Sequence, residues 1–115
     1  YRGIVVGTGN KVEDYGVGFY TKYGDGGVDI APIADLYKSE VWDLGKSLGI
    51  DSRIIEAKPT DGLWDDGRTD EDQLGATYSE LEEAMETGKG TGLKVLEEYA
   101  RMNAHKMNPI PTFTL

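Results

Sequence analysis

The chain has 115 residues, and its 21 Asp and Glu outnumber its 12 Lys and Arg, which gives a net charge of −9 at pH 7. This balance argues against a nucleic-acid-binding surface, because such surfaces carry clustered Lys and Arg. No apolar run reaches the ~18 residues of a membrane span, no signal peptide is expected, and the absence of cysteine excludes a disulfide framework. We therefore expect a cytoplasmic protein without nucleic-acid or membrane partners.

The first predicted element is a strand over residues 3–7, Gly-Ile-Val-Val-Gly. A short unbroken apolar run between glycines is typical of a strand that is buried on both faces of a parallel sheet. The next segment, residues 8–14, is polar and rich in turn formers, so we expect a loop. Because ligands bind at the carboxyl ends of strands in open parallel sheets, this loop is a candidate binding site.

Glycine and polar residues dominate residues 15–34, which are predicted to form a long loop with at most one short helical turn. Residues 58–75 form a second such loop. Long ordered loops in compact domains are usually functional or mobile.

Four helices are predicted, over residues 35–48, 51–57, 77–87 and 93–106. In the first, Asp35 is the expected N-cap, and an apolar stripe recurs with helical spacing from Tyr37 to Leu48. In the second, Ile54 and Ile55 are expected to be buried. The third begins with Thr77 and Glu80 in capping-box spacing, and the fourth ends before Asn108-Pro109.

Several charged residues have two interpretations from the sequence alone. Glu13 is either a surface carboxylate or a magnesium ligand, because one or two carboxylates suffice when substrate phosphates complete the site. Lys22 and Lys38 are either surface lysines or ligand cations, although Lys38 in the first turn of a helix opposes the helix dipole. Asp25 and Asp29, within a glycine-rich turn, are turn formers or ligand contacts.

Lys106 is the more informative cation. At about 100° per residue it falls on the apolar face of helix 93–106, together with Val95 and Tyr99, whereas His105 points away. Either the helix has frayed at this point, or Lys106 reaches a ligand from the helix end.

Three segments partly resemble short nucleotide-binding or calcium-binding motifs, but none matches its motif. Gly7-Thr8-Gly9 lacks the third glycine of a dinucleotide fingerprint, Gly88-Lys89-Gly90-Thr91 is not a Walker A loop, and the Asp-rich stretch 65–72 does not have calcium-loop spacing.

A series of longer motifs runs along nearly the whole chain. It comprises Gly7-Thr8-Gly9-Asn10-Lys11 with Glu13, residues 19–27 (Phe-Tyr-Thr-Lys-Tyr-Gly-Asp-Gly-Gly) with Asp29, Lys58-Pro59-Thr60 with Leu63-Trp64, Thr69-Asp70-Glu71, Leu74-Gly75 with Tyr78, and His105-Lys106 with Pro109. In these residues and in their order the chain resembles ammonia-dependent NAD synthetase.

The resemblance implies an α/β fold, a Rossmann-like parallel sheet with flanking helices of the adenine nucleotide alpha-hydrolase type. It also implies a homodimer with the dinucleotide near the dimer interface. The family's Ser-Gly-Gly-x-Asp-Ser phosphate loop lies in the N-terminal half of the domain and is absent here. We therefore expect residues 1–115 to be the C-terminal part of a single synthetase domain.

The implied reaction forms NAD from deamido-NAD, ATP and ammonia through an NAD-adenylate, with magnesium assisting. Carried over by matching motifs, the implied ATP contacts are Thr8, Lys38 and Thr60, and the implied magnesium ligand is Glu13. The implied deamido-NAD contacts are Lys22, Asp29, His105 and Lys106. Because adenylate intermediates hydrolyse in water, loop 58–75 is expected to order over bound substrate, with Leu63 and Trp64 as its anchor. The alternative is a permanently packed surface loop.

Two departures from the family pattern are visible. Val12 stands where many members have Ser, and Asp61-Gly62 stands where many have Ala-Asp. Two alternative functions remain open, the synthetase domain of a glutamine-dependent NAD synthetase and a nucleotide-binding module that has lost catalysis. The second is disfavoured, because such a relic has no reason to keep scattered ligand contacts.

Overall fold

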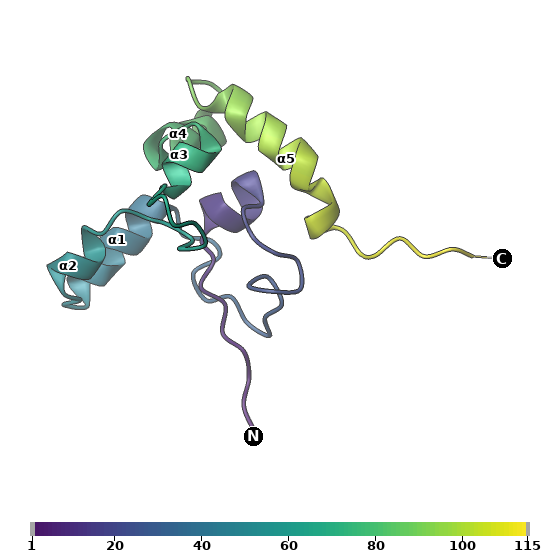
Figure 1. Ribbon diagram of the computed structural model, residues 1–115, viewed down its shortest axis with the longest axis horizontal. Helices are drawn as coiled ribbons and strands as arrows, with labels where there is room; N and C mark the ends of the chain where they lie inside the picture. Colours follow the sequence, from purple (N-terminus) through teal and green to yellow (C-terminus); the bar gives the residue numbers. More distant parts are fainter. Residues whose placement is uncertain (1, 115) are drawn as a thin grey trace.

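The computed structural model describes residues 2–114, and over these residues the chain is helical with long irregular connections (Figure 1). A π-helix and five α-helices occur in this part of the chain. They are η1 (Lys11–Val17), α1 (Lys38–Ser47), α2 (Ser52–Ile55), α3 (Asp70–Leu74), α4 (Tyr78–Thr87) and α5 (Leu93–Met107). None of the helices in the described range is long and apolar enough to cross a membrane.

The π-helix η1 lies at the centre of the packing, where α4 and α5 contact both it and each other. Its N-terminus is held by Asn10, whose side-chain oxygen accepts hydrogen bonds from the backbone N–H groups of Val12 and Glu13, each at 3.0 Å. Gly18, at φ 66°, ends the helix in the left-handed region, which glycine enters without strain. The expected polar loop over residues 8–14 is therefore wrong from Lys11 onward, because a capping box starts a helix there.

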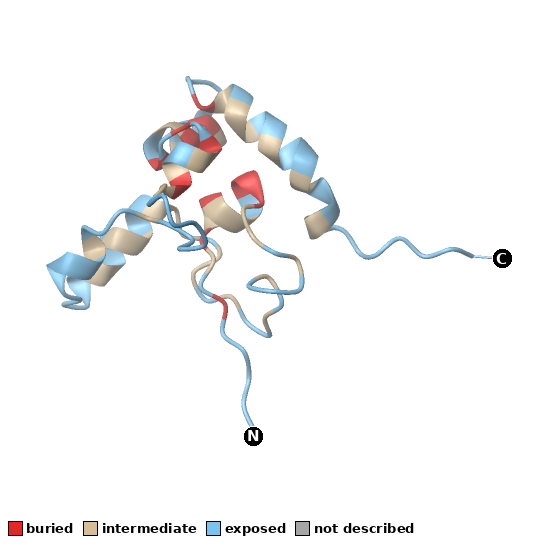
Figure 2. Cartoon of the chain, viewed as in Figure 1, coloured by how far each residue is buried: buried red, intermediate tan, exposed pale blue. Residues whose placement is uncertain are grey.

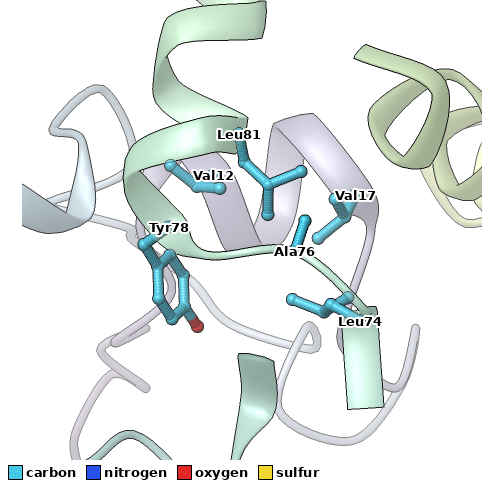
Figure 3. Close-up of a cluster of buried hydrophobic side chains, with 6 residues drawn as sticks. All are labelled: Val12, Val17, Leu74, Ala76, Tyr78 and Leu81. Carbon is cyan, nitrogen blue, oxygen red and sulfur yellow. The ribbon is translucent and has the colours of Figure 1, made fainter. Parts of the chain in front are cut away.

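A small hydrophobic core joins η1, the end of α3, α4 and the short connection between α3 and α4 (Figure 3). Its buried members are Val12, Val17, Leu74, Ala76, Tyr78 and Leu81. Buried residues gather where these elements meet, whereas α1, α2 and both chain ends show mostly exposed or half-buried surface (Figure 2).

The third and fourth predicted helices are confirmed to within one residue. Thr77 caps α4, with its hydroxyl oxygen accepting the Glu80 N–H at 3.2 Å, and the Glu80 carboxylate accepts the Thr77 N–H at 2.9 Å. Helix α5 continues to Met107, so fraying does not explain the orientation of Lys106.

The predicted buried strand over residues 3–7 is not found. Ile4, Val5 and Val6 are exposed, and residues 2–114 contain no regular strand, only a parallel bridge between Val6 and Ile30. The Gly7 N–H donates to the Ile30 carbonyl at 2.7 Å. Burial on both faces needs neighbouring strands and covering helices, and within residues 2–114 the backbone hydrogen bonds of this segment run to residues 29–30. The expected parallel sheet is therefore not confirmed.

The α1–α2 hairpin also differs from the prediction. Helix α1 begins at Lys38 rather than at residue 35, and Asp35 forms an ion pair with Lys11 at 3.1 Å instead of capping the helix. Leu48 and Ile54 are each 69% exposed, so the expected burial of Ile54 is wrong. The hairpin extends away from the core (Figure 1), so little of its apolar stripe is covered.

Candidate active site

Four polar side chains converge beside the core, and we call Glu13, Lys38, Asp70 and Tyr78 the inner cluster. The Lys38 ammonium donates to Glu13 Oε1 at 2.6 Å, and each of these two side chains is only 17% exposed. The Tyr78 hydroxyl oxygen lies 3.0 Å from Glu13 Oε1 and 2.9 Å from Asp70 Oδ2. The Lys38 ammonium also lies 5.0 Å from the centroid of the Tyr78 ring.

Each member of the inner cluster comes from the first turn of its helix. Glu13 is the third residue of η1, and Lys38, Asp70 and Tyr78 are the first residues of α1, α3 and α4. Side-chain caps fix three of these starts, since Asn10, Thr69 and Thr77 each accept a backbone N–H two or three residues on. Local capping therefore positions the cluster.

Asp70 is the most unusual member electrostatically. Its side chain belongs to a residue only 7% exposed, and Oδ1 is buried without a hydrogen-bond partner in the described residues. Burial raises the pKa of the Asp70 carboxyl above its ordinary value, although the bond from Tyr78 opposes this. Burial, reinforced by the neighbouring charge of Glu13, also raises the pKa of the Tyr78 phenol, which therefore stays protonated.

The donor set of Glu13 fits a magnesium ion that is shared with substrate phosphates. Glu13 Oε1 is taken by Lys38 and Tyr78, but Oε2 has only a weak 3.4 Å contact with the Asn10 N–H. Residues 2–114 contain no group of three or more His, Cys, Asp or Glu able to hold a metal. Magnesium often binds through one or two carboxylates plus phosphate oxygens. Glu13 therefore fits a site that substrate phosphates complete, and not a site made of protein ligands alone.

A second group of cations lies where the end of α5 meets η1 and the first loop, and we call Lys22 and Lys106 the outer lysine pair. Lys106 donates to the Gly18 carbonyl at 2.6 Å and lies 5.3 Å from the centroid of the Tyr20 ring. Lys22 donates to the carbonyls of His105, at 2.8 Å, and Asn108. Neither lysine has a carboxylate within ion-pair distance among residues 2–114.

A cavity of about 610 Å³ is lined by Lys106 of the outer lysine pair and by residues of both long loops. Lys106 lines it together with Phe19 and Tyr20 from the first loop and Asp61 and Leu63 from the second. It therefore combines aromatic surface, a cation and carboxylates in one space.

The remaining predicted site residues lie outside these two groups. Thr8 is exposed, and Asp29 accepts a hydrogen bond from the Val5 N–H at 2.7 Å. The Thr60 hydroxyl donates to the Arg68 carbonyl at 3.0 Å and accepts the Gly62 N–H at 3.1 Å, so it closes the second loop on itself. The imidazole of His105 is exposed, with Nδ1 3.1 Å from the Met102 carbonyl.

Asp14 follows Glu13 on η1, and its carboxylate lies against Gly9, where any Cβ would collide with it. Burial and the neighbouring charges of Glu13 and Asp25 raise the pKa of Asp14 to about 6.

The sequence interpretation assigned no role to Asp70 or Tyr78. Tyr78 follows the predicted cap Thr77, whereas Asp70 lies in the predicted loop 58–75, where helix α3 and its cap Thr69 were missed. The sequence carries no signal that these two starts face Glu13.

Comparison with known proteins gives consistent matches. A sequence profile of the family described as NAD synthase matches residues 1–111. The NH(3)-dependent NAD(+) synthetase of Archaeoglobus fulgidus is 48% identical over 107 residues, covering 93% of this chain and 39% of the relative. The structure of NMN synthetase from Francisella tularensis matches with TM-score 0.84 and 39% identity, over 100% of this chain and 48% of that chain.

A second solved structure matches at a lower level. The NH3-dependent NAD synthetase from Campylobacter jejuni, in complex with nitrate, gives TM-score 0.63 and 29% identity, over 96% of this chain and 45% of that chain. The chain thus spans less than half the length of the relatives it matches.

Proposed function

The chain belongs to the NAD synthase family, and from this premise we propose that it carries part of the active site of an enzyme that amidates deamido-NAD to NAD. In the proposed reaction a nicotinate carboxylate oxygen attacks the α-phosphorus of ATP and displaces pyrophosphate. Ammonia then attacks the acyl carbon, loses a proton, and AMP leaves. The observation that carries the proposal is the buried Glu13–Lys38 pair within a family match that spans residues 1–111.

We assign the inner cluster to ATP. Lys38 would exchange its bond with Glu13 for a phosphate oxygen, which explains a lysine placed against the dipole of α1. Glu13 would hold magnesium through Oε2, and the ion when bound neutralises charge on the polyphosphate. Thr8 and Thr60 complete the proposed ATP contacts, with Thr60 acting from the second loop.

We assign the outer lysine pair and its cavity to the dinucleotide. Within residues 2–114, no carboxylate at ion-pair distance compensates the charges of Lys22 and Lys106, because carbonyl oxygens hold them. Uncompensated cations beside aromatic side chains suit phosphates and a pyridine ring. Asp29 and His105 complete the proposed deamido-NAD contacts.

We further propose that residues 1–115 form the C-terminal part of one synthetase domain. The matched segment covers only 39% of the Archaeoglobus fulgidus relative, and the family's Ser-Gly-Gly-x-Asp-Ser loop does not occur in this sequence. On this view residues 3–7 and 29–30 are pieces of a parallel Rossmann-like sheet. The parallel orientation of the Val6–Ile30 bridge supports that assignment. A homodimer in the cytoplasm is part of the same proposal.

A mononucleotide substrate is the second candidate. The higher of the two structural similarities, TM-score 0.84 at 39% identity, is to a protein named NMN synthetase. By analogy, the acid form of NMN would be adenylated and amidated at the same carboxylate, and the inner cluster would have the same role.

The test is an assay of the complete synthetase that contains this chain. Deamido-NAD and the acid form of NMN are supplied separately with ATP and magnesium, and ammonium is compared with glutamine as nitrogen donor. Amide product and AMP in equal amounts from deamido-NAD and ammonium support the main proposal. Turnover of the mononucleotide alone supports the second candidate, glutamine-dependent turnover supports a glutaminase-linked enzyme, and binding without turnover indicates a module that has lost catalysis.

The isolated 115-residue chain is the matched control in that assay. We expect it to form no NAD, because the backbone N–H groups of the absent phosphate loop would hold the pyrophosphate. Turnover by the isolated chain at the rate of the complete enzyme would contradict the domain assignment.

A further inference from the structure

We propose that Tyr78 is a positioning residue for the Glu13 carboxylate and that Asp70 fixes the direction in which the Tyr78 hydroxyl donates. The inference rests on the proposed function, in which Glu13 holds magnesium. No role for Asp70 or Tyr78 in the reaction follows from the motifs or from the comparisons.

The Tyr78 hydroxyl oxygen lies within hydrogen-bond distance of two carboxylates, at 3.0 Å from Glu13 Oε1 and 2.9 Å from Asp70 Oδ2. A phenol has a single proton to donate. It can therefore serve one carboxylate as donor, and the other contact is satisfied only if that carboxylate brings a proton of its own.

Glu13 and Asp70 differ in their surroundings, and this difference decides which carboxylate carries that proton. Glu13 already accepts a hydrogen bond from the Lys38 ammonium at 2.6 Å, so a cation lies directly beside it. Asp70 has no cation within ion-pair distance among residues 2–114, is 7% exposed, and has an unpartnered Oδ1. An isolated buried carboxylate is costly in its charged form. The arrangement that satisfies both contacts is Asp70 donating to Tyr78 and Tyr78 donating to Glu13.

These bonds hold one oxygen of the Glu13 carboxylate and leave the other open. Lys38 and Tyr78 both hold Oε1, which leaves Oε2 for a metal. When Lys38 turns to a nucleotide phosphate, Tyr78 remains as the side chain that fixes Oε1. The Tyr78 ring is 1% exposed and packs edge-on against Trp42 with centroids 6.4 Å apart, so it offers a rigid support.

The experiment compares Tyr78→Phe with Tyr99→Phe in the complete synthetase. Tyr99 is the matched control, because its hydroxyl donates to the Gln73 carbonyl at 2.9 Å and does not contact the inner cluster. Tyr78→Phe is expected to raise the magnesium concentration for half-maximal rate roughly 10-fold, the low end of what a lost outer-shell partner costs. Tyr99→Phe is expected to leave it unchanged. An unchanged magnesium requirement in Tyr78→Phe overturns the inference.

Asp70→Asn tests the direction of the bonds. The amide NH₂ replaces the acid hydrogen as donor to Tyr78, so the magnesium requirement is expected to stay at the wild-type value. If Asp70→Asn raises the magnesium requirement as much as Tyr78→Phe, Asp70 acts as the acceptor, and the proposed direction is wrong.

A readout that needs no turnover separates this inference from the proposed function. A buried hydrogen-bonded phenol gives a downfield proton resonance, which is assigned by its loss in Tyr78→Phe. It is expected to shift in Glu13→Gln and to remain in Tyr99→Phe. An inactive wild-type synthetase with this behaviour refutes the proposed function and leaves the geometry standing. An active wild type whose Tyr78 resonance does not shift in Glu13→Gln refutes the inference.

Discussion

The inner cluster and the outer lysine pair hold their cations in opposite ways. Lys38 is bonded to a carboxylate and is largely buried beside the core, whereas Lys22 and Lys106 are bonded to backbone carbonyls near the end of α5. A carboxylate neutralises the lysine it binds, and a carbonyl orients a lysine without removing its net charge. The difference suggests two modes of anion binding, one by exchange and one by direct attraction.

Binding a phosphate by exchange at Lys38 couples nucleotide binding to metal binding, whereas direct attraction at the outer lysine pair does not. If a phosphate takes Lys38 from Glu13, the freed carboxylate becomes an attractive partner for a divalent cation, so nucleotide and metal binding become coupled. The outer lysine pair offers no such coupling, since no carboxylate is released there. We therefore expect metal-dependent phenotypes from the inner cluster and metal-independent phenotypes from the outer lysine pair.

The largest expected effect is that of Glu13→Gln in the complete synthetase. The amide keeps the shape of the side chain but removes the charge that would bind magnesium. We expect a higher magnesium requirement and a loss of kcat equivalent to several kcal/mol, the scale of metal-assisted charge stabilisation. Magnesium titrations of the initial rate measure both effects, with Glu86→Gln at an exposed position of α4 as control. An unaltered magnesium dependence would return Glu13 to the status of a surface carboxylate.

Lys106→Met tests the other side of the comparison. The change removes the charged donor of the Gly18 carbonyl, so we expect a stability loss of about 1.5–3 kcal/mol. The KM for the dinucleotide should rise, and the magnesium requirement should not change. Chemical denaturation and initial rates measure these quantities. Lys94→Met is the control, because Lys94 is an exposed lysine on the same helix. A change in magnesium requirement for Lys106→Met would break the distinction between the two groups.

The structure shows which sequence signals carry through to the fold. Helix α4 was predictable from its capping box and apolar face, and helix α5 from its apolar face and the Asn108-Pro109 stop. Helix η1 was missed because its capping-box residues, Asn10 and Glu13, were interpreted only as part of a polar loop. The predicted burial of segment 3–7 and of the apolar stripe on α1 was wrong for a different reason. Their apolar patterns are clear, but burial depends on partners that the pattern does not specify.

The same limit applies to the candidate site. The sequence placed Lys38 against the helix dipole and Lys106 on the apolar face of its helix, because each of these features follows from position on one helix. That Glu13 and Lys38 form a pair depends on how η1 and α1 are placed, 25 residues apart along the chain. Asp70 and Tyr78 join the cluster only through that packing. Local rules thus gave the orientation of single residues, and tertiary contacts decided which ones meet.

Loop 58–75 divides into two parts that should respond differently to ligand. Residues 70–74 form α3, with Asp70 and Leu74 buried, whereas Leu63 is 79% and Trp64 53% exposed. Few buried contacts mean a low free energy of opening. We expect hydrogen exchange of residues 60–68 to slow when ATP and deamido-NAD bind, and that of residues 70–75 to change little. Equal protection of residues 60–68 with and without both substrates would reject the covering role.

The smallest expected effect concerns Asp14, which lies on η1 between the two groups and feels charge from Glu13 and Asp25. Its pKa in the folded protein is raised from 3.8 to about 6. Between these two pH values the folded chain therefore binds a proton that the unfolded chain does not. The free energy of unfolding therefore falls as pH rises through this window. Above it the ionised Asp14 carboxylate destabilises the folded chain to its full extent. Asp14→Asn should therefore raise Tm at pH 7 and have no effect below about pH 4.

The size of that effect follows from exposure. Asp14 is only half-buried, so solvent screens its carboxylate and we expect a gain below about 1 kcal/mol at pH 7. Thermal unfolding of Asp14→Asn at pH 4 and at pH 7 measures it, and Asp65→Asn at an exposed loop position is the control. A gain at pH 7 that persists at pH 4 would mean that shape, not charge, limits Asp14. A gain in Tm with an unchanged magnesium requirement would show that the Asp14 carboxylate destabilises the folded chain independently of the inner cluster.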